Sequence, residues 1–246
     1  METKKKIIFI KDWILNYVNS MPKKAKSLVI GISGGIDSSV SSTLSAMTGL
    51  KTIVLSMPIK QKNSQHDLSL AHQEWLKNKF ENVEGHTIEL DNLFKNFEST
   101  LADFSSEHGM ANSRARLRMT TLYQVAAANN GIVVGTGNKV EDFGVGFYTK
   151  YGDGGVDISP IADCTKTQVW EMGKSLGIIK EIIEAEPTDG LWDDGRTDTN
   201  QLGMSYDELE KAMMDKTSEG YSKYLEIRKK NLHKMNPIPV CMMEDE

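Results

Sequence analysis

The sequence predicts a single α/β domain over residues 1–246, built on a Rossmann-like parallel β-sheet with helices on both faces. Three observations support this fold class. Short apolar runs rich in Val and Ile alternate with longer segments that have helical periodicity. The chain has 246 residues, a length that suits one large domain of this kind. Hydrophobic residues make up 39% of the chain and charged residues 26%, as in ordinary globular proteins.

The first predicted elements are a helix, a strand and a second helix. An amphipathic helix is expected near the N-terminus, because the basic cluster Lys4–Lys6 precedes apolar residues 7–10 and charge returns at Lys11. A buried strand follows at residues 28–32, and an Ala-, Ser- and Leu-rich helix begins near Asp37. This strand and helix form the first unit of the alternation.

Further strand and helix units follow along the chain. Residues 51–57 are predicted as the second strand and residues 64–80 as a helix with one apolar side. The later elements are a strand at 86–90, helices at 93–104 and 112–129, and a strand at 131–135. Such alternation gives parallel strands with right-handed crossovers, whose following loops meet at one edge of the sheet. The loops expected to converge there begin at Ser33, Met57 and Thr136.

The turn Ser33–Gly35 carries the clearest chemical signal. Two glycines let the backbone approach a ligand, and the free amides that open the next helix point at an anion such as phosphate. Ser33, Ser38 and Ser39 add hydroxyl donors, and Asp37 suits an Mg²⁺ shared with that phosphate. The alternative is a tight turn capped by Ser or Asp. Since no Gly-Lys-Ser/Thr closes it, the loop is not a Walker A motif. It resembles the Ser-Gly-Gly-x-Asp-Ser loop of the N-type ATP pyrophosphatases.

Three arginines lie two residues apart near the start of the helix predicted at 112–129, at Arg114, Arg116 and Arg118. Residues two apart do not share a helical face, so at most two of them can point into one site. Guanidinium groups are good partners for nucleotide phosphates. The alternative is a solvated basic face.

Residues 135–157 form a polar, glycine-rich stretch directly after the fourth strand. Ordering such a loop costs backbone entropy, which ligand contacts would offset. Glu141 is the candidate for a second Mg²⁺ carboxylate opposite Asp37, with a surface ion pair as the alternative. Further on, Thr165 is a good N-cap, and Lys166 in the first turn opposes the helix dipole unless an anion lies nearby. This favours a phosphate beside Lys166.

Several segments, in their order and spacing, resemble the ammonia-dependent NAD synthetases over about residues 5–240. The segments are Ser33–Ser38, Asn112–Met119, Gly135–Thr136, Phe147–Gly155, Glu186–Thr188 and Ser205–Leu209. The Phe147–Gly155 segment is the most diagnostic, since other ATP pyrophosphatases share only the first loop. The resemblance implies ATP-dependent amidation of deamido-NAD to NAD, through a deamido-NAD adenylate, with release of AMP and pyrophosphate. Glutamine-using members carry an additional amidase domain before this module, so free ammonia is the implied nitrogen donor.

Matched position by position, the resemblance also implies roles for single residues. The implied ATP-binding residues are Gly31, Ile32, Ser33, Gly34, Gly35, Ile36, Asp37, Ser38, Met57, Thr136, Lys166 and Thr188. Those implied for deamido-NAD are Arg116, Lys150, Asp157, His233 and Lys234. Asp37 and Glu141 match the positions that hold Mg²⁺. Family members are homodimers whose deamido-NAD site crosses the interface.

Catalysis is expected to involve Lys166 and Asp153. Asp153 lies between glycines next to the matched substrate positions, and we expect it to bind ammonium and to take its proton, because only neutral ammonia can attack. The turn at 142–144 is longer than in one familiar variant of the family pattern, so the contacts of residues 142–146 are left open.

Composition argues against several other classes. Cys164 and Cys241 lack the spacing of a metal site or disulfide framework, which favours a reducing, cytoplasmic location. No apolar run approaches the roughly 20 residues that span a bilayer. The net charge is −5, and the chain has no dense basic tract, which argues against a nucleic-acid surface and so against a tRNA-modifying enzyme. The other rival, a non-catalytic nucleotide-binding module, would not need the loop residues Glu141, Lys150, Asp153 and Asp157.

Two groups of residues complete the expectations. Residues 186–204 are polar and have little periodicity, which predicts a mobile loop with Trp192 as an apolar anchor. Four histidines lack metal-binding spacing and are expected at the surface or at helix caps, namely His66, His72, His86 and His108.

Overall fold

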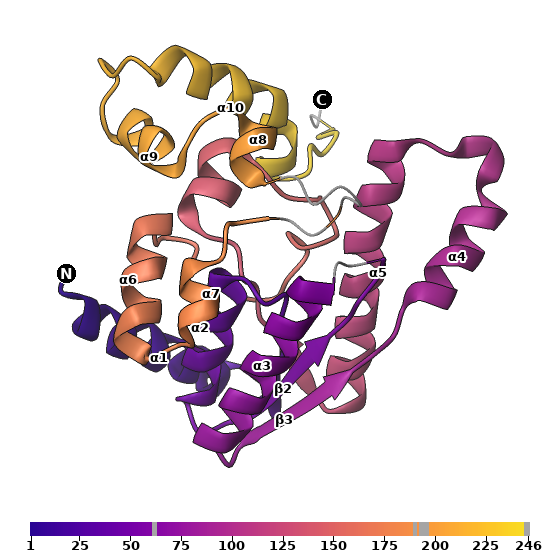
Figure 1. The fold of residues 1–246 in the computed structure, drawn as a ribbon, viewed down its shortest axis with the longest axis vertical. Coiled ribbons are helices and arrows are strands. Elements are labelled where there is room, and N and C mark those ends of the chain that lie inside the picture. The colour runs from indigo at the N-terminus through magenta and orange to yellow at the C-terminus, as the bar shows by residue number, and fades with distance from the viewer. Residues whose placement is uncertain (61–62, 189–190, 192–196, 244–246) are drawn as a thin grey trace.

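The computed structural model of the chain describes residues 1–60, 63–188, 191 and 197–243 (Figure 1). Within these residues lies one four-stranded sheet of parallel strands, in the spatial order β3-β2-β1-β4. The strands are β1 (Ser27–Gly31), β2 (Lys51–Ser56), β3 (Val83–Thr87) and β4 (Gly131–Val133). The predicted α/β fold class with a parallel sheet is confirmed.

Side chains of the central strands alternate between two hydrophobic layers, one on each face of the sheet. Leu28, Ile30 and Val54 belong to one layer, and Val29 and Ile53 belong to the other. The first layer packs against α1 (Thr3–Ser20), α2 (Ile36–Ala46), α3 (Asn63–Lys79) and α6 (Lys166–Leu176). The second packs against α4 (Asp91–Thr100) and α5 (Glu107–Ala128). Helices therefore cover both faces, as the sequence predicts.

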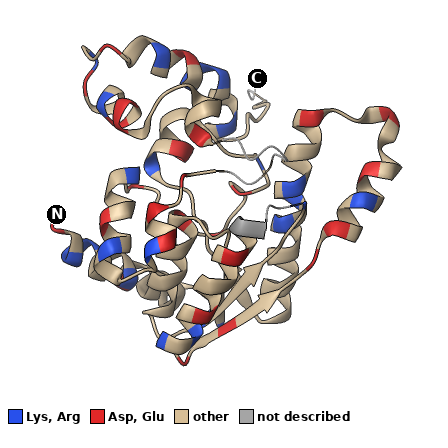
Figure 2. Cartoon of the chain, viewed as in Figure 1, with Lys and Arg blue, Asp and Glu red and all other residues tan. Residues whose placement is uncertain are grey.

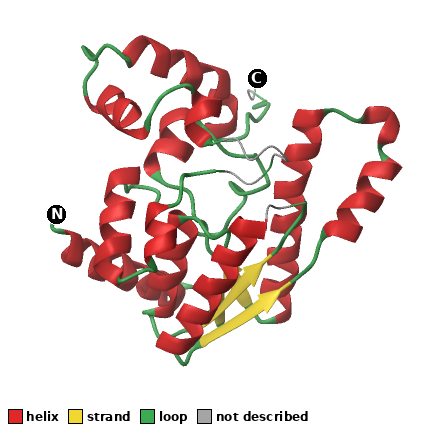
Figure 3. Cartoon of the chain, in the orientation of Figure 1, coloured by secondary structure: helices red, strands yellow, loops and turns green. Residues whose placement is uncertain are grey.

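The C-terminal part of the chain forms a helical group at the end of the molecule toward which the strands point (Figures 1 and 3). Its own hydrophobic cluster joins Leu209, Ala212 and Tyr224 to Val140 and Val145. The elements of this group are the π-helix η2 (Lys139–Val145), α8 (Asp198–Leu202), α9 (Tyr206–Met214) and α10 (Tyr221–Met235). Two short helices lie elsewhere, η1 (Ala102–Phe104) and α7 (Lys180–Glu184).

The position of the third strand differs from the prediction. The apolar pattern predicts it at 86–90, whereas β3 occupies Val83–Thr87. As an edge strand, β3 has a single buried residue, Val83, so no apolar run marks it. Ile88 and Leu90, which suggest the later position, follow the strand and pack in the second layer.

Three other segments contain more helix than the sequence indicates. Helix α5 begins at Glu107 rather than at 112, because the Oγ atom of its N-cap Ser106 accepts a hydrogen bond from the Gly109 amide at 3.1 Å. The glycine-rich stretch contains η2, and the stretch 186–204 contains α8. Residues 189–190 and 192–196 lie outside the described residues, so the predicted mobility there, with the Trp192 anchor, stays a prediction.

His72 contradicts the expectation that the histidines lie at the surface or at caps. Its side chain is fully buried behind α2, with Nε2 2.9 Å from the Ser42 hydroxyl, and its ring stacks on Trp75 at 5.5 Å. Burial lowers the pKa of His72 to about 4. His86 and His108 are exposed, as expected.

The structure shows where the charged residues (Figure 2) and the two cysteines lie. Lys and Arg, like Asp and Glu, occur in many parts of the described chain (Figure 2). Cys164 is a buried free thiol and Cys241 an exposed one. Among the residues that the structure describes, no helix has both the length and the apolarity that crossing a bilayer requires.

Candidate active site

A cavity of about 270 Å³ opens where the loops after β1, β2 and β4 meet. Ser33, Met57 and Thr136 all line it, so these loops converge as expected. The other lining residues with a predicted role are Gly31, Ile32, Gly34, Gly35, Ile36, Asp37, Ser38, Glu141, Asp153, Lys166 and Thr188. The structure therefore gathers every residue predicted for ATP and Mg²⁺ around one space, while the binding itself stays a prediction.

The turn between β1 and α2 is shaped by its glycines and serines. Gly34 has a φ of 85°, in the left-handed region that favours glycine. The Ser38 hydroxyl accepts from the Ser33 amide at 3.2 Å and donates to the Gly35 carbonyl at 3.1 Å. The Ser33 hydroxyl accepts from the Gly35 amide at 3.2 Å. The hydroxyls predicted to face a phosphate thus also hold the loop that would receive it.

Lys166 lies at the centre of a buried ion cluster. Its Nζ is 2.6 Å from Asp37 Oδ2 and 2.8 Å from Glu141 Oε1, and its side chain is 2% exposed. Thr165 caps α6 in a reciprocal capping box with Gln168, which fixes the first turn and so the origin of the lysine side chain. The sequence predicts a phosphate as the anion beside Lys166. In this structure the carboxylates of Asp37 and Glu141 are the anions in contact with it.

The cluster shifts the pKa of each member. Burial raises the pKa of Asp37, and the Lys166 charge offsets this only in part. Burial acts on Glu141 too, but Lys166 together with hydrogen bonds from Tyr206 and Asn138 holds the pKa of Glu141 below its usual value. Burial alone would lower the pKa of Lys166, yet the two carboxylates outweigh it and raise that pKa. Lys166 is therefore charged at neutral pH.

Three residues of the cluster were missed by sequence reasoning. Asn138 caps η2 by accepting from the Val140 and Glu141 amides, and its Nδ2 donates to Asp37 Oδ1 at 3.0 Å. The hydroxyl of Tyr206 lies 2.6 Å from Glu141 Oε1 and 2.9 Å from Asp198 Oδ2. The signal for Asn138 was available, because Asn is a favoured N-cap. Nothing local links Tyr206 or Asp198 to Glu141.

Asp153 lines the cavity, and Lys234 lies near enough to Asp153 to interact with its charge. The Asp153 Oδ1 atom accepts from the Thr149 amide at 2.9 Å. The Lys234 ammonium donates to the Tyr148 carbonyl at 2.8 Å, while burial lowers the pKa of Lys234 against the opposing charges of Asp153 and Asp142. Burial, followed by the charge of Asp153, raises the pKa of Asp142 well above its usual value. Burial and neighbouring carboxylates thus favour the protonated form of Asp142, while the Lys234 ammonium interacts with the charges of Asp153 and Asp142.

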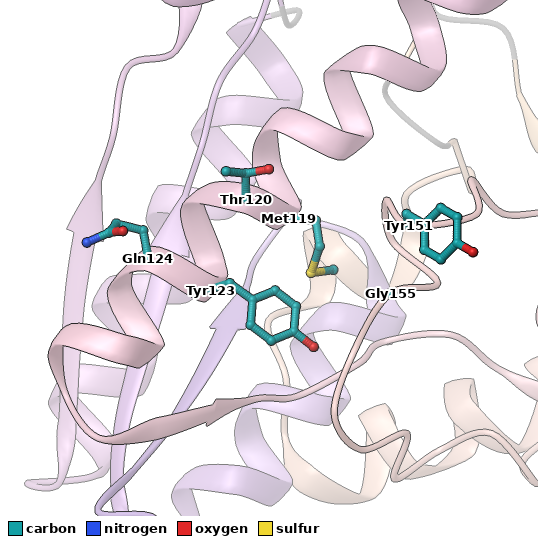
Figure 4. A pocket seen from close by; sticks show the side chains of 6 residues that line it. All are labelled: Met119, Thr120, Tyr123, Gln124, Tyr151 and Gly155. Atoms are coloured by element: carbon teal, nitrogen blue, oxygen red, sulfur yellow. The ribbon is translucent and has the colours of Figure 1, made fainter.

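A second hollow of about 480 Å³ lies beside α5 (Figure 4). Its lining residues are Met119, Thr120, Tyr123, Gln124, Tyr151 and Gly155. Met119 lines both the hollow and the first cavity, so the two spaces share a wall.

Three of the residues predicted for deamido-NAD lie around this second hollow rather than in the first cavity. Asp157 accepts from the Tyr123 hydroxyl at 2.9 Å and from the Val133 amide at 2.7 Å. Arg116 Nε donates to the Lys150 carbonyl at 3.2 Å, and Lys150 Nζ lies 5.5 Å from the Tyr151 ring. Of the other two, Lys234 lies near Asp153, and His233 precedes it at the end of α10.

Asp37 and Glu141 fit the partial shell that Mg²⁺ takes when it is shared with the phosphates of a substrate. Such an ion uses one or two protein carboxylates, and phosphate oxygens and waters complete its shell. Both carboxylates face one point, since each has an oxygen within 2.8 Å of the same Nζ atom. Their donor chemistry is that of hard, oxygen-binding cations.

Comparison with known proteins assigns the family. Residues 6–243 match the sequence model of the NAD synthase family. An NH₃-dependent NAD⁺ synthetase of Mesoplasma florum is 38% identical to the chain and covers 81% of it, as the chain covers 81% of that protein.

Two solved structures share the fold. The NMN synthetase of Francisella tularensis has a TM-score of 0.91 at 31% identity, and covers 99% of this chain and 100% of its own. The NH₃-dependent NAD synthetase of Campylobacter jejuni has a TM-score of 0.78 at 24% identity, covering 98% and 100%. Because the family model and a relative 38% identical to it both extend over most of its length, the chain belongs to the NAD synthase family.

Proposed function

We propose that the chain amidates the nicotinate carboxylate of deamido-NAD with free ammonia, using ATP and giving NAD, AMP and pyrophosphate. The observation that carries this proposal is the cavity in which Asp37, Glu141 and Lys166 lie beside the glycine turn of β1, in a chain of this family. The activity makes the chain a ligase of the last step of NAD biosynthesis. Its free thiols, Cys164 and Cys241, are in keeping with work in the cytoplasm.

The first step is adenylation of the substrate carboxylate. The carboxylate attacks the α-phosphorus of ATP, and pyrophosphate leaves toward the Ser33–Ser38 turn, whose backbone amides and helix N-terminus bind anions. Asp37 and Glu141 hold Mg²⁺, which when bound neutralises charge on the departing pyrophosphate. Lys166 exchanges a carboxylate for a phosphate oxygen, and so keeps its charge on the reacting nucleotide.

The second step is attack by ammonia on the acyl adenylate, with AMP as the leaving group. Asp153 lines the cavity, and its carboxylate is suited to a small cation such as ammonium. Ammonium binds there and gives one proton to Asp153. The ammonia formed attacks the acyl carbon, AMP leaves with the electrons of the acyl–oxygen bond, and the new nitrogen loses its second proton to the departing phosphate or to water.

Substitution of Asp153 tests the second step. Asp153→Asn keeps the shape of the side chain and removes its negative charge, so adenylation continues while amidation slows by about 100-fold, the usual contribution of a general base. Pyrophosphate release and NAD formation, followed separately, measure the two steps. Asp163→Asn is the matched control, because Asp163 is 95% exposed and pairs with Lys139 on the surface. Equal slowing of both steps by Asp153→Asn would exclude the proton-accepting role.

The second hollow beside α5 suits the part of deamido-NAD that does not react. It shares Met119 with the first cavity and has Arg116, Lys150 and Asp157 around it. A dinucleotide can therefore extend from the reacting carboxylate in one space to its far phosphates and base in the other. In a homodimer the second copy would close this open hollow.

A mononucleotide substrate is the second candidate. The NMN synthetase of Francisella tularensis has a higher TM-score than the NAD synthetase of Campylobacter jejuni, 0.91 against 0.78. Nicotinate mononucleotide undergoes the same two steps and would leave the second hollow empty. The sequence relatives, such as the Mesoplasma florum synthetase, favour deamido-NAD instead.

One assay tests the function and separates the candidates. Purified protein with Mg²⁺, ATP and ammonium is given deamido-NAD, nicotinate mononucleotide, bulk tRNA or no acid, and pyrophosphate release is followed. We expect release with deamido-NAD at a kcat/KM at least tenfold above that with the mononucleotide. The reverse order would assign the mononucleotide as substrate. Release with tRNA alone would exclude both.

A further inference from the structure

The Tyr206 hydroxyl lies between two carboxylates that belong to different elements. It is 2.6 Å from Glu141 Oε1 on η2 and 2.9 Å from Asp198 Oδ2 on α8. Tyr206 is the first residue of α9 and does not line the active-site cavity, whereas Glu141 and Asp198 both line it. The two reaction steps proposed above give this hydroxyl no role.

The position of the hydroxyl is fixed by its surroundings. The Tyr206 side chain is 6% exposed, and its ring meets Trp170 edge-on at 5.9 Å and 89°. Ser205 and Glu208 form a reciprocal capping box that sets the start of α9. The ring of Tyr206 also packs in the hydrophobic cluster of the C-terminal helical group. The tyrosine is therefore a rigid donor at the back of the ion cluster.

Glu141 Oε1 receives both strong donors of the cluster. The Lys166 ammonium lies 2.8 Å from it and the Tyr206 hydroxyl 2.6 Å from it. When Lys166 turns to a phosphate oxygen, the Tyr206 hydroxyl stays bonded to the Oε1 atom that the lysine leaves, so it helps to aim the carboxylate. A charge-assisted bond of this kind is about twice as strong as one between neutral groups.

Asp198 connects the same hydroxyl to the loop before α8. Its backbone amide donates to the Pro187 carbonyl at 3.0 Å, and the next residue, Thr188, lines the cavity. A phenol has one proton for two carboxylates, so its bonds to Glu141 and Asp198 alternate. The Tyr206 hydroxyl thus contacts both Glu141 and the residue, Asp198, that is hydrogen-bonded to Pro187 beside Thr188.

We propose that Tyr206 is a positioning residue that orients the Glu141 carboxylate toward the Mg²⁺ of the bound nucleotide, with Asp198 holding the hydroxyl in place. Tyr206 itself does not touch the substrate. The proposal rests on the proposed function for the identity of the nucleotide, and it requires no particular acid substrate.

The test measures nucleotide binding without turnover. An α,β-methylene analogue of ATP, in which the bond that the reaction breaks is blocked, is titrated calorimetrically into the full chain at a series of Mg²⁺ concentrations. The proteins are the wild type, Tyr206→Phe, Asp198→Asn and the double variant. Loss of one charge-assisted hydrogen bond should raise the half-saturating Mg²⁺ concentration of Tyr206→Phe about tenfold. Binding of the analogue without Mg²⁺ should not change. The double variant should bind no more weakly than Tyr206→Phe, because the two side chains act as a unit.

Tyr224→Phe is the matched control, since Tyr224 is a buried tyrosine of the same cluster, is 8% exposed and does not line the cavity. Equal Mg²⁺ dependence in wild type and Tyr206→Phe would overturn the proposal, and so would additive effects or an equal shift in Tyr224→Phe. The binding readout needs no acid, so wild-type protein that binds the analogue but amidates nothing would refute the proposed function alone.

Discussion

Lys166 shows how a single buried charge organises this site. Burial of an ammonium is costly unless anions compensate it, and Asp37 and Glu141 do so from two segments that are far apart in the chain. The sequence predicted an anion beside this lysine and carboxylates at these two positions. It did not predict that they pair with one another, because the pairing depends on α2, η2 and α6 meeting at one edge of the sheet.

Removal of this charge should affect folding as well as activity. Lys166→Met leaves two buried carboxylates together, which should lower the free energy of unfolding by about 3 kcal/mol and abolish pyrophosphate release. Denaturant unfolding and the pyrophosphate assay measure the two effects. Lys174→Met, on the exposed side of the same helix, should leave both nearly unchanged. Full stability in Lys166→Met would mean that the ion cluster is not formed in the free protein.

His72 should make stability depend on pH. Its pKa is lowered from 6.5 to about 4 in the folded chain, so on acidification the unfolded chain takes up a proton first. Its contribution to stability is therefore complete above pH 6.5 and declines as pH falls toward 4, by about 2 kcal/mol between about pH 7.5 and about pH 5. Denaturant midpoints at the two pH values should fall less in His72→Gln than in wild type. His108→Gln, at an exposed position, should behave as wild type; a wild-type slope in His72→Gln would show that other groups control it.

At the scale of elements, the strand, turn and helix of residues 27–46 connect the fold to the proposed chemistry. The left-handed Gly34 turns the chain from β1 into α2, whose first residues line the cavity. A continuous run of apolar residues was enough to predict the strand of this unit, because β1 is central in the sheet and both of its faces are buried.

Alanine substitutions at Gly34 and at Gly49 distinguish the cost of backbone strain from an effect on ATP binding. Gly34→Ala and Gly49→Ala both force a methyl group onto a left-handed residue, with φ of 85° and 77°, and should cost about 1 to 2 kcal/mol of stability. Only Gly34→Ala should weaken ATP binding, because Gly34 lines the cavity, whereas an added Cβ at Gly49 meets no atom within 4 Å. Thermal unfolding and ATP titration distinguish the two. Normal ATP binding by Gly34→Ala would argue against phosphate binding at the turn.

Other elements could not be predicted from local pattern. The edge strand β3 has one buried residue, and the apolar residues that follow it gave a wrong position. The π-helix η2 was missed because it lies in the glycine-rich stretch 135–157, yet it carries Glu141 and packs on α9 and α10 through Val140 and Val145. Both depend on contacts with distant segments, for which a single sequence gives no signal. Tyr206 and Asp198 escaped prediction for the same reason.

At the scale of the whole molecule, the two hollows lie on either side of Met119, one enclosed by loops and one open beside α5. Exposed apolar side chains also remain on α1, where Ile8 is 54% and Phe9 is 60% exposed. A single copy thus leaves both the second hollow and an apolar helix face in contact with solvent.

The chain should therefore form a homodimer in solution. Sedimentation equilibrium should give a mass twice the 27.4 kDa of one chain. A dilution series serves as the control, since a dimer that exists only at high concentration would dissociate across it. A mass of one chain with full amidation of deamido-NAD would show that the second hollow works without a partner.

In the free protein the Lys166 ammonium occupies the position between the two carboxylates that are proposed to bind Mg²⁺. Its charge offsets the charges of Asp37 and Glu141 when no nucleotide is bound. The site therefore attracts divalent ions less strongly than two unpaired carboxylates would. Chelators should then leave the melting temperature of the free protein unchanged while they stop its turnover. On the proposed function, the free protein keeps its ion cluster without metal, and Mg²⁺ would enter together with the nucleotide rather than as a structural ion.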